Sequence, residues 1–294
     1  MKEKRPKKKP TKKSGQWGLV LMGGGARGLA HIGVIEVLLE NGLVPSVITG
    51  TSMGALVGGL FATGYLPREI EDLANQFNNT KLAKLRRSSI PIPDKLLDFL
   101  MFESYQKRLS HRLGLEKSGS FDKILKALVG DILIEDLPFR FGCNAVNLVT
   151  GKEVNFTNGP LYRALRASLS YPFVIEPARF ARGVLIDGGL LNNVPIKLAR
   201  QLGASKVLVP DVHRRLKRIP AGSIDSAVAM MDRLIQVILT ESTESKLQGA
   251  DLIININSEV DTFDFSKIKK LVNLGKRVTQ SNLKNIKKMI RQAA

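Results

Sequence analysis

The chain has 294 residues, of which 44% are hydrophobic, and its 45 Lys and Arg against 26 Asp and Glu give a formal net charge of +19. This size suffices for one globular domain with a substantial core, and we expect one domain rather than two. The single cysteine, Cys143, excludes an internal disulfide and favours a reducing compartment. Because no uncharged apolar run approaches about 18 residues and no signal-peptide core follows the basic start, we predict a cytoplasmic protein without a membrane span.

The start of the chain is strongly basic. Residues 1–14 hold eight Lys or Arg against Glu3, a net charge of +7, and this composition predicts a disordered tail over residues 1–16. Three interpretations stay open: a solvated tail without a partner, peripheral contact with the anionic inner face of a membrane, and nucleic-acid binding. Nucleic acid is disfavoured because no zinc-finger spacing or aromatic-basic stripe accompanies the charge.

The first expected unit is a strand over residues 17–22, a glycine-rich loop over 23–28 and a helix over 29–40. The loop satisfies G-x-G-x-x-G, so a dinucleotide-binding turn is one interpretation. The next strand, over residues 45–49, lacks the acidic residue that would hold ribose hydroxyls, which argues against it. The N–H groups of the loop could instead stabilise an oxyanion, and Arg27 would either add positive charge there or be an exposed loop arginine.

The next motif surrounds Ser52, with Gly50 two residues before it and Gly54 two residues after it. This is the G-x-S-x-G pattern of a nucleophile elbow. A short β-branched strand precedes it and a small, apolar helix over residues 55–62 follows, as that motif requires. The alternative is a glycine-rich turn that contains an incidental serine.

Between residues 65 and 137 the sequence is charged and mostly helical in pattern, with a helix start at residues 66–69. The run over residues 90–102 is denser in apolar groups than one buried helix face requires. Two interpretations stay open for this run: a wall for acyl chains or a membrane-facing lid, and an ordinary packed helix.

The pattern then predicts a hairpin of residues 139–148 with 153–156, and a helix over 161–168. A second hairpin turns at residues 181–183 and ends at Asp187, which two glycines follow. An aspartate at a strand end, freed by glycines, is placed like a catalytic carboxylate, whereas the alternative is an Asp-Gly turn. A helix over residues 196–202 and a buried strand over 206–209 follow.

These three motifs, in this order, resemble the patatin-like phospholipase family. The resemblance covers residues 18–211 and includes the stretches 28–34, 167–172 and 192–195. The sequence departs from the family pattern at Met22, where some members have an acidic residue. This position lies outside the oxyanion loop. The fold implied is α/β, with three α/β/α layers around a mostly parallel sheet. We expect a hydrolase domain over residues 17–211 and a helical and strand extension over 212–294 packed on the same domain.

The resemblance implies a serine lipid acyl hydrolase of phospholipase A, lysophospholipase or esterase type, acting through an acyl-enzyme on a lipid acyl ester without metal or cofactor. Ser52 is then the nucleophile and Asp187 the general base and acid, and Asp187 should be partly desolvated to raise its pKa. The implied oxyanion-binding residues are Gly23, Gly24, Gly25, Ala26, Arg27, Gly28 and Met53, and the elbow and turn glycines are Gly50, Gly54, Gly188 and Gly189.

Two other functions stay open: a Ser-Asp-His esterase that uses His213, and a catalytically silent protein that docks on a membrane. We expect a structural hydrogen bond for His31 and an exposed position for His111. Residues 268–290 have the pattern of an amphipathic helix whose apolar face either packs on the domain or inserts into lipid.

Overall fold

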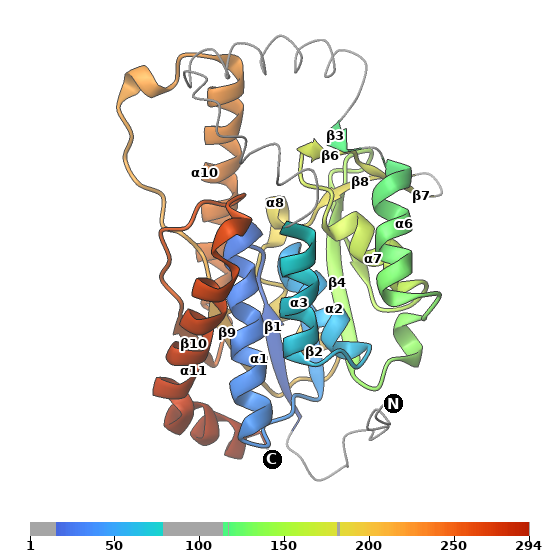
Figure 1. Ribbon diagram of the computed structural model, residues 1–294, viewed down its shortest axis with the longest axis vertical. Helices are drawn as coiled ribbons and strands as arrows, with labels where there is room; N and C mark the ends of the chain where they lie inside the picture. The colour runs from blue at the N-terminus through green and yellow to red at the C-terminus, as the bar shows by residue number, and fades with distance from the viewer. Residues whose placement is uncertain (1–15, 79–113, 117, 181–182, 294) are drawn as a thin grey trace.

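The computed structural model describes residues 16–78, 114–116, 118–180 and 183–293. One eight-stranded sheet runs through the molecule in the order β10, β9, β1, β2, β4, β8, β7, with β5 paired to β4 (Figure 1). A separate pair of short strands, β3 and β6, lies beside it. The strands are β1 (Trp17–Leu21), β2 (Val47–Gly50), β3 (Gly114–Glu116), β4 (Arg140–Asn147), β5 (Lys152–Phe156), β6 (Phe173–Ile175), β7 (Ala178–Phe180), β8 (Gly183–Asp187), β9 (Lys206–Asp211) and β10 (Leu252–Asn255).

Helices cover both faces of this sheet. Consecutive residues of a strand face opposite sides of the sheet, and Phe141 and Gly142 are consecutive on β4. Phe141 lies against one helix layer, and Leu198 of the other layer lies over Gly142. The three-layer α/β/α prediction is therefore confirmed. The helices are α1 (Ala30–Glu40), α2 (Met53–Ala62), α3 (Pro67–Asn78), α6 (Ser118–Val129), α7 (Leu161–Ser168), α8 (Gly189–Asn192), α9 (Ile196–Gln201), α10 (Ala227–Leu247) and α11 (Ile268–Arg291).

Strand direction decides which chain ends meet. Strands β10, β9, β1, β2 and β4 are mutually parallel, so their carboxyl ends share one edge of the sheet. Strand β4 continues past Cys143, the partner of Gly50, and β8 runs back antiparallel along this extension. Asp187 at the end of β8 pairs with Ala145, which brings it close to the level at which β2 ends.

Most predicted elements match the observed ones. The hairpin of β4 and β5 and the helix α7 are confirmed, and α3 begins at Pro67 as expected. The first helix starts later than predicted, because residues Gly25–Leu29 form a 3-10 turn before α1. The strand β3 was not expected. The basic tail and the apolar run over residues 90–102 lie outside the described residues.

The C-terminal amphipathic helix packs on the protein. In α11, Leu271, Val272 and Ile286 are fully buried, so the alternative that this apolar face inserts into lipid is wrong. Helices α1 and α11 approach so closely that a Cβ at Gly275 would lie 2.0 Å from the carbonyl oxygen of Ala30. In the described ranges we find no helix that is long and apolar enough to cross a bilayer.

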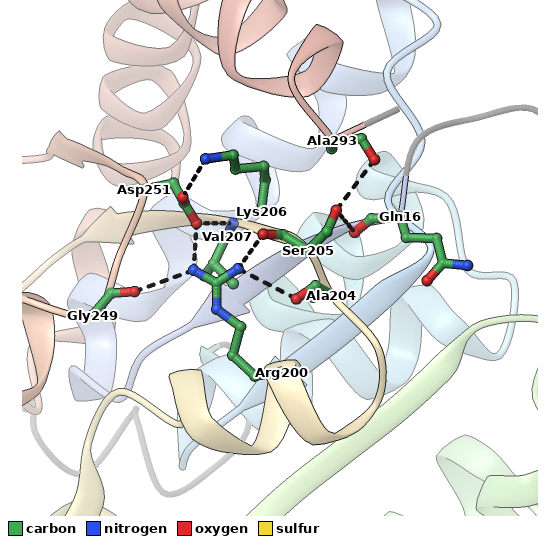
Figure 2. Close-up of polar contacts among 9 residues, drawn as sticks. All are labelled: Gln16, Arg200, Ala204, Ser205, Lys206, Val207, Gly249, Asp251 and Ala293. Atoms are coloured by element: carbon green, nitrogen blue, oxygen red, sulfur yellow. Dashed lines mark hydrogen bonds and ion pairs between the residues drawn. The ribbon is translucent and has the colours of Figure 1, made fainter.

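A cluster of polar contacts lies at the edge of the sheet where the parallel strands begin, near the start of β9 (Figure 2). The carboxylate of Asp251 accepts hydrogen bonds from Arg200, from Lys206 Nζ at 2.9 Å and from the backbone N–H of Val207 at 2.8 Å. Beside it, the Ser205 hydroxyl lies 3.0 Å from the carbonyl oxygen of Gln16 and 3.2 Å from that of Ala293. This cluster joins α9, β9 and the segment before β10 to residues near both ends of the described chain.

We predict that Gly275→Ala destabilises the protein by about 2 kcal/mol, because the new methyl group must push α11 away from the backbone of α1. Urea denaturation measures the change. Gly222→Ala is the matched control, since a Cβ at Gly222 meets nothing within 4 Å, and it should change stability by less than about 0.5 kcal/mol. Equal stability of the two variants would contradict the close helix contact.

Candidate active site

Ser52 lies on the turn between β2 and α2, with φ 53° and ψ −124°. Among the described residues it is the one non-glycine residue with a positive φ. The turn packs directly on the end of β1, because a Cβ at Gly54 would lie 2.0 Å from the carbonyl oxygen of Leu21. A Cβ at Gly50 would lie 2.6 Å from the backbone nitrogen of Ala55. Both glycines of the pattern are therefore required by close backbone contact.

Asp187 is 2% exposed and lies at the end of β8. The backbone N–H of Gly189 donates a hydrogen bond of 2.8 Å to its Oδ1 atom. Desolvation raises the pKa of Asp187 to about 6, although the Ser52 hydroxyl and the Gly189 N–H both oppose this rise by interacting with the carboxylate. The Oδ2 atom has no hydrogen-bond partner among the described residues. Ser52 is nevertheless close enough to the carboxylate to lower its pKa.

The glycine loop lies beside this pair. A Cβ at Gly23 would lie 3.2 Å from Ser52 Cβ, and Gly28 packs against the side chain of Met53. Some N–H groups of the loop already have partners: that of Gly23 donates to Asn193 Oδ1 at 3.1 Å and that of Ala26 to the Thr262 carbonyl at 2.7 Å.

Three N–H groups of the glycine loop and of the turn at Ser52 have no hydrogen bond to any described residue. They belong to Gly24 and Gly25 in the loop and to Met53 at the first position of α2. The N–H of Ser52 itself donates to the Ser168 hydroxyl at 2.9 Å. Of the oxyanion-binding residues that the sequence suggested, Gly24, Gly25 and Met53 therefore have the N–H groups that remain available.

Arg27 is buried, so the interpretation as an exposed loop arginine is wrong. Its Nη1 atom donates to the Val260 carbonyl at 2.9 Å and its Nε atom to the Val212 carbonyl at 3.2 Å. Burial lowers the pKa of this guanidinium, with the nearby Arg214 acting in the same direction. Arg27 thus fastens the glycine loop to the segments that follow β9 and β10.

Two asparagines join the motifs, and the sequence reasoning missed their role. Asn193 Oδ1 accepts from the N–H of Gly23, while its Nδ2 atom lies 3.3 Å from the Gly23 carbonyl and donates to Thr243 Oγ1 at 2.8 Å. Asn144 Oδ1 accepts from Thr51 Oγ1 at 2.7 Å, and Asn144 Nδ2 donates to the Asn192 carbonyl at 2.8 Å. Asn144 is fully buried, and the signal available in the sequence was one polar residue inside the otherwise apolar run of residues 141–146.

The three histidines lie apart from this arrangement or outside the described residues. His31 is fully buried and its Nε2 atom lies 2.9 Å from the Met22 carbonyl, which confirms the expected structural hydrogen bond. Burial lowers the pKa of His31 to about 4. His213 is half-buried, with Nε2 3.3 Å from Thr240 Oγ1, and no contact in the described ranges joins it to Ser52 or Asp187. His111 lies outside the described residues.

Comparison with known proteins identifies the family. Residues 19–200 match the family model described as patatin-like phospholipase, so the chain belongs to the patatin-like phospholipase family. It is 32% identical over 203 residues to Lysophospholipase NTE1 of the yeast Scheffersomyces stipitis, covering 69% of this chain and 12% of the yeast protein. It is 34% identical over 197 residues to an uncharacterized NTE family protein of Mycobacterium bovis, covering 67% of this chain and 30% of that protein.

A solved structure shares the fold at low sequence identity. Human GIVD cytosolic phospholipase A2 superposes with a TM-score of 0.52 at 11% identity, over 95% of this chain and 60% of the human chain. The chain thus spans a small part of the curated relatives and a larger part of this structural neighbour. No cluster of three or more His, Cys, Asp or Glu side chains that could hold a metal ion occurs in the described ranges.

We predict that Ser52→Gly is more stable than Ser52→Ala by about 1 kcal/mol. A side chain at positive φ carries a conformational cost of roughly 1–3 kcal/mol, which glycine avoids, while glycine's greater freedom in the unfolded chain offsets part of the gain. Urea denaturation of the two variants measures the difference. A more stable Ser52→Ala protein would show that the turn is unstrained.

We predict that Asp187→Asn stabilises the protein at pH 8 but not at pH 4. The folded pKa of about 6 lies above the ordinary pKa of an aspartate, about 3.9, so the native state favours the protonated acid. Wild-type stability therefore declines as pH rises from about 4 to about 6. The neutral amide avoids this loss, which amounts to at most about 3 kcal/mol. Urea denaturation of both proteins at the two pH values measures it, and an equal difference at both would contradict a raised pKa.

Proposed function

We propose that this chain is a serine lipid acyl hydrolase that uses Ser52 and Asp187 as a catalytic dyad. The observation that carries the proposal is the position of Ser52 on a strained turn beside a buried carboxylate whose pKa is raised to about 6. An ordinary carboxylate is a weak base at neutral pH, whereas a pKa near 6 makes proton transfer more effective. Membership of the patatin-like phospholipase family supports an ester of a lipid as the substrate.

In the proposed reaction, Asp187 removes the Ser52 proton while Ser52 Oγ attacks the ester carbonyl carbon. The negative charge that develops on the carbonyl oxygen is stabilised by the N–H groups of Gly24, Gly25 and Met53 and by the N-terminal end of α2. The protonated Asp187 then donates its proton to the departing alcohol. In the second half-reaction Asp187 takes a proton from water, the hydroxide attacks the acyl-enzyme, and Ser52 regains its proton as the fatty acid leaves.

A panel of lipids tests which class of lipid the proposed site hydrolyses. The fungal relatives are named lysophospholipases, so lysophospholipids come first in a panel that also contains phospholipids and neutral glycerides. Each lipid is incubated with the protein and with Ser52→Ala, and released fatty acid is measured. A substrate of the proposed site loses its hydrolysis in the variant.

We also propose that the protein is cytoplasmic and contacts anionic membranes peripherally, with the basic tail raising the local substrate concentration. Residues 1–15 lie outside the described residues, so the support is the charge of that segment. Vesicle co-sedimentation of the full chain and of a chain beginning at Gly15 tests the tail. Equal binding of both to anionic vesicles at low salt would exclude its role.

We predict that Ser52→Ala and Asp187→Asn each lower kcat/KM for a soluble short-chain ester at least about a thousandfold, because the dyad acts as a unit. His213→Ala should retain most of the activity, since its contacts do not reach the dyad. A comparable loss in His213→Ala would favour the Ser-Asp-His alternative. Equal, negligible activity in all four proteins would favour the catalytically silent alternative.

We predict that kcat/KM for the soluble ester falls below about pH 6 and is level above about pH 7. The free enzyme needs the ionised form of Asp187 as its base, and protonation removes that form as pH falls through the pKa of about 6. A pH profile from about 4.5 to about 8.5 measures the apparent pKa. The profile of His213→Ala serves as the control and should show the same inflection.

A further inference from the structure

Helix α10 carries a row of large apolar side chains that face solvent. Its exposed residues of this kind are Met230, Met231, Leu234, Val237 and Ile238. Their spacing places them on one side of the helix. With Ile224 just before α10 and Leu191 on α8, they account for seven of the fourteen exposed large hydrophobic side chains in the described ranges, so the clustering is not the ordinary scatter of single apolar residues.

Another side of α10 is anchored at the candidate active site. Ser242 Oγ donates to the carbonyl of Gly189 at 2.7 Å and accepts from the N–H of Asn193 at 3.0 Å. Leu239 packs against Gly189, two residues after Asp187. The exposed row therefore belongs to a helix that is fixed to the loop carrying Asp187, the proposed base. In Figure 1, α10 lies beside α8 and projects past the edge of the sheet.

The segment that leads into α10 is basic. Residues 213–226 contain four Lys or Arg against a single acidic residue, Asp225. Arg214 and Lys217 form ion pairs with Asp261 and Glu259, while Arg215 and Arg218 are exposed. An apolar row flanked by basic side chains matches an anionic lipid surface, which offers hydrocarbon beneath a negatively charged layer of headgroups.

We propose that the exposed row of α10, with Leu191 and the basic segment 213–226, is the surface by which the protein docks on an anionic lipid bilayer. This inference rests on the proposed lipid hydrolysis, because a bilayer is the source from which such a substrate would reach Ser52. The C-terminal helix α11 is excluded as the apolar contact, since its own apolar face is buried against α1. Docking through α10 places the loop of Asp187 next to the lipid surface.

The first test compares two double variants of the full chain in a Ser52→Ala background, where catalysis cannot alter the vesicles. Met230→Gln with Leu234→Gln removes two apolar side chains that are 56% and 50% exposed. Leu66→Gln with Ile124→Gln is the matched control, because Leu66 before α3 is 56% exposed and Ile124 on α6 is 44% exposed. Co-sedimentation uses vesicles of phosphatidylcholine with or without phosphatidylglycerol.

We expect the α10 variant to partition onto phosphatidylglycerol vesicles about tenfold less than its parent, with the control unchanged. Arg215→Gln with Arg218→Gln should weaken binding to these vesicles and not to neutral ones. Circular dichroism checks that each variant folds. Equal binding of the α10 variant and its parent would overturn the proposal.

A second measurement depends on the cysteine content. Cys143 is the single cysteine and is fully buried, and burial raises the pKa of its thiol, so a new surface cysteine is labelled selectively. Leu234→Cys carrying an environment-sensitive fluorophore should shift to shorter wavelength on phosphatidylglycerol vesicles, whereas Leu66→Cys should not. A shift at Leu66 alone, or at neither position, would contradict docking through α10.

The remaining outcomes separate this inference from its premises. A labelled Leu234→Cys protein that shifts with protein concentration in the absence of vesicles, together with a dimer by light scattering, would assign the row to a second copy of the chain and overturn the proposal. Vesicle binding that depends on α10 in a protein without esterase activity would uphold docking while rejecting the proposed hydrolysis. Full activity on a soluble ester, together with vesicle binding that does not depend on α10, would uphold the proposed hydrolysis and reject docking through α10.

Discussion

The contact between the end of β1 and the turn after β2 is the constraint on which the site depends. The Leu21 carbonyl accepts a hydrogen bond from the N–H of Thr51 at 3.1 Å, and the same oxygen lies where a side chain at Gly54 would have to be. The turn therefore has no space to relax outward, and Ser52 is held at positive φ. Because β1 continues directly into the glycine loop, this one contact also fixes the loop beside Ser52.

Asp187 reaches Ser52 by a different route. Strand β8 is antiparallel to β4, so it begins beyond the carboxyl edge of the parallel strands and runs back toward that edge. Because β4 extends past Cys143, β8 ends with Asp187 opposite Ala145, close to the edge where β2 ends. Asn144 lies on the extended part of β4 and bonds to Thr51 and to Asn192. The elbow and the aspartate loop are thus positioned by one buried polar network.

The sequence predicted the elements that carry glycines and periodic apolar residues, because those features act locally. Strand β1, helix α7 and the elbow turn follow from residues within about ten positions of each other. Contacts over long sequence separations were not predictable in this way. Three features depend on segments that lie more than 150 positions apart in the sequence. These are the burial of Arg27, the hydrogen bond between Asn193 and Gly23, and the close crossing of α11 and α1 at Gly275. Likewise, the amphipathic pattern of α11 could not by itself distinguish protein packing from lipid contact.

The two long C-terminal helices differ in where their apolar side chains lie. Helix α11 buries its apolar side against the protein, whereas α10 exposes a row of large apolar side chains. In α11 the apolar side faces α1, and the close approach at Gly275 requires it to stay there. In α10 the polar groups Ser242 and Thr243 are buried because they bond to the aspartate loop and Asn193, so much of the apolar surface is left outward. The hydrogen bonds that position the proposed base are therefore the physical reason why α10 presents large apolar side chains to solvent.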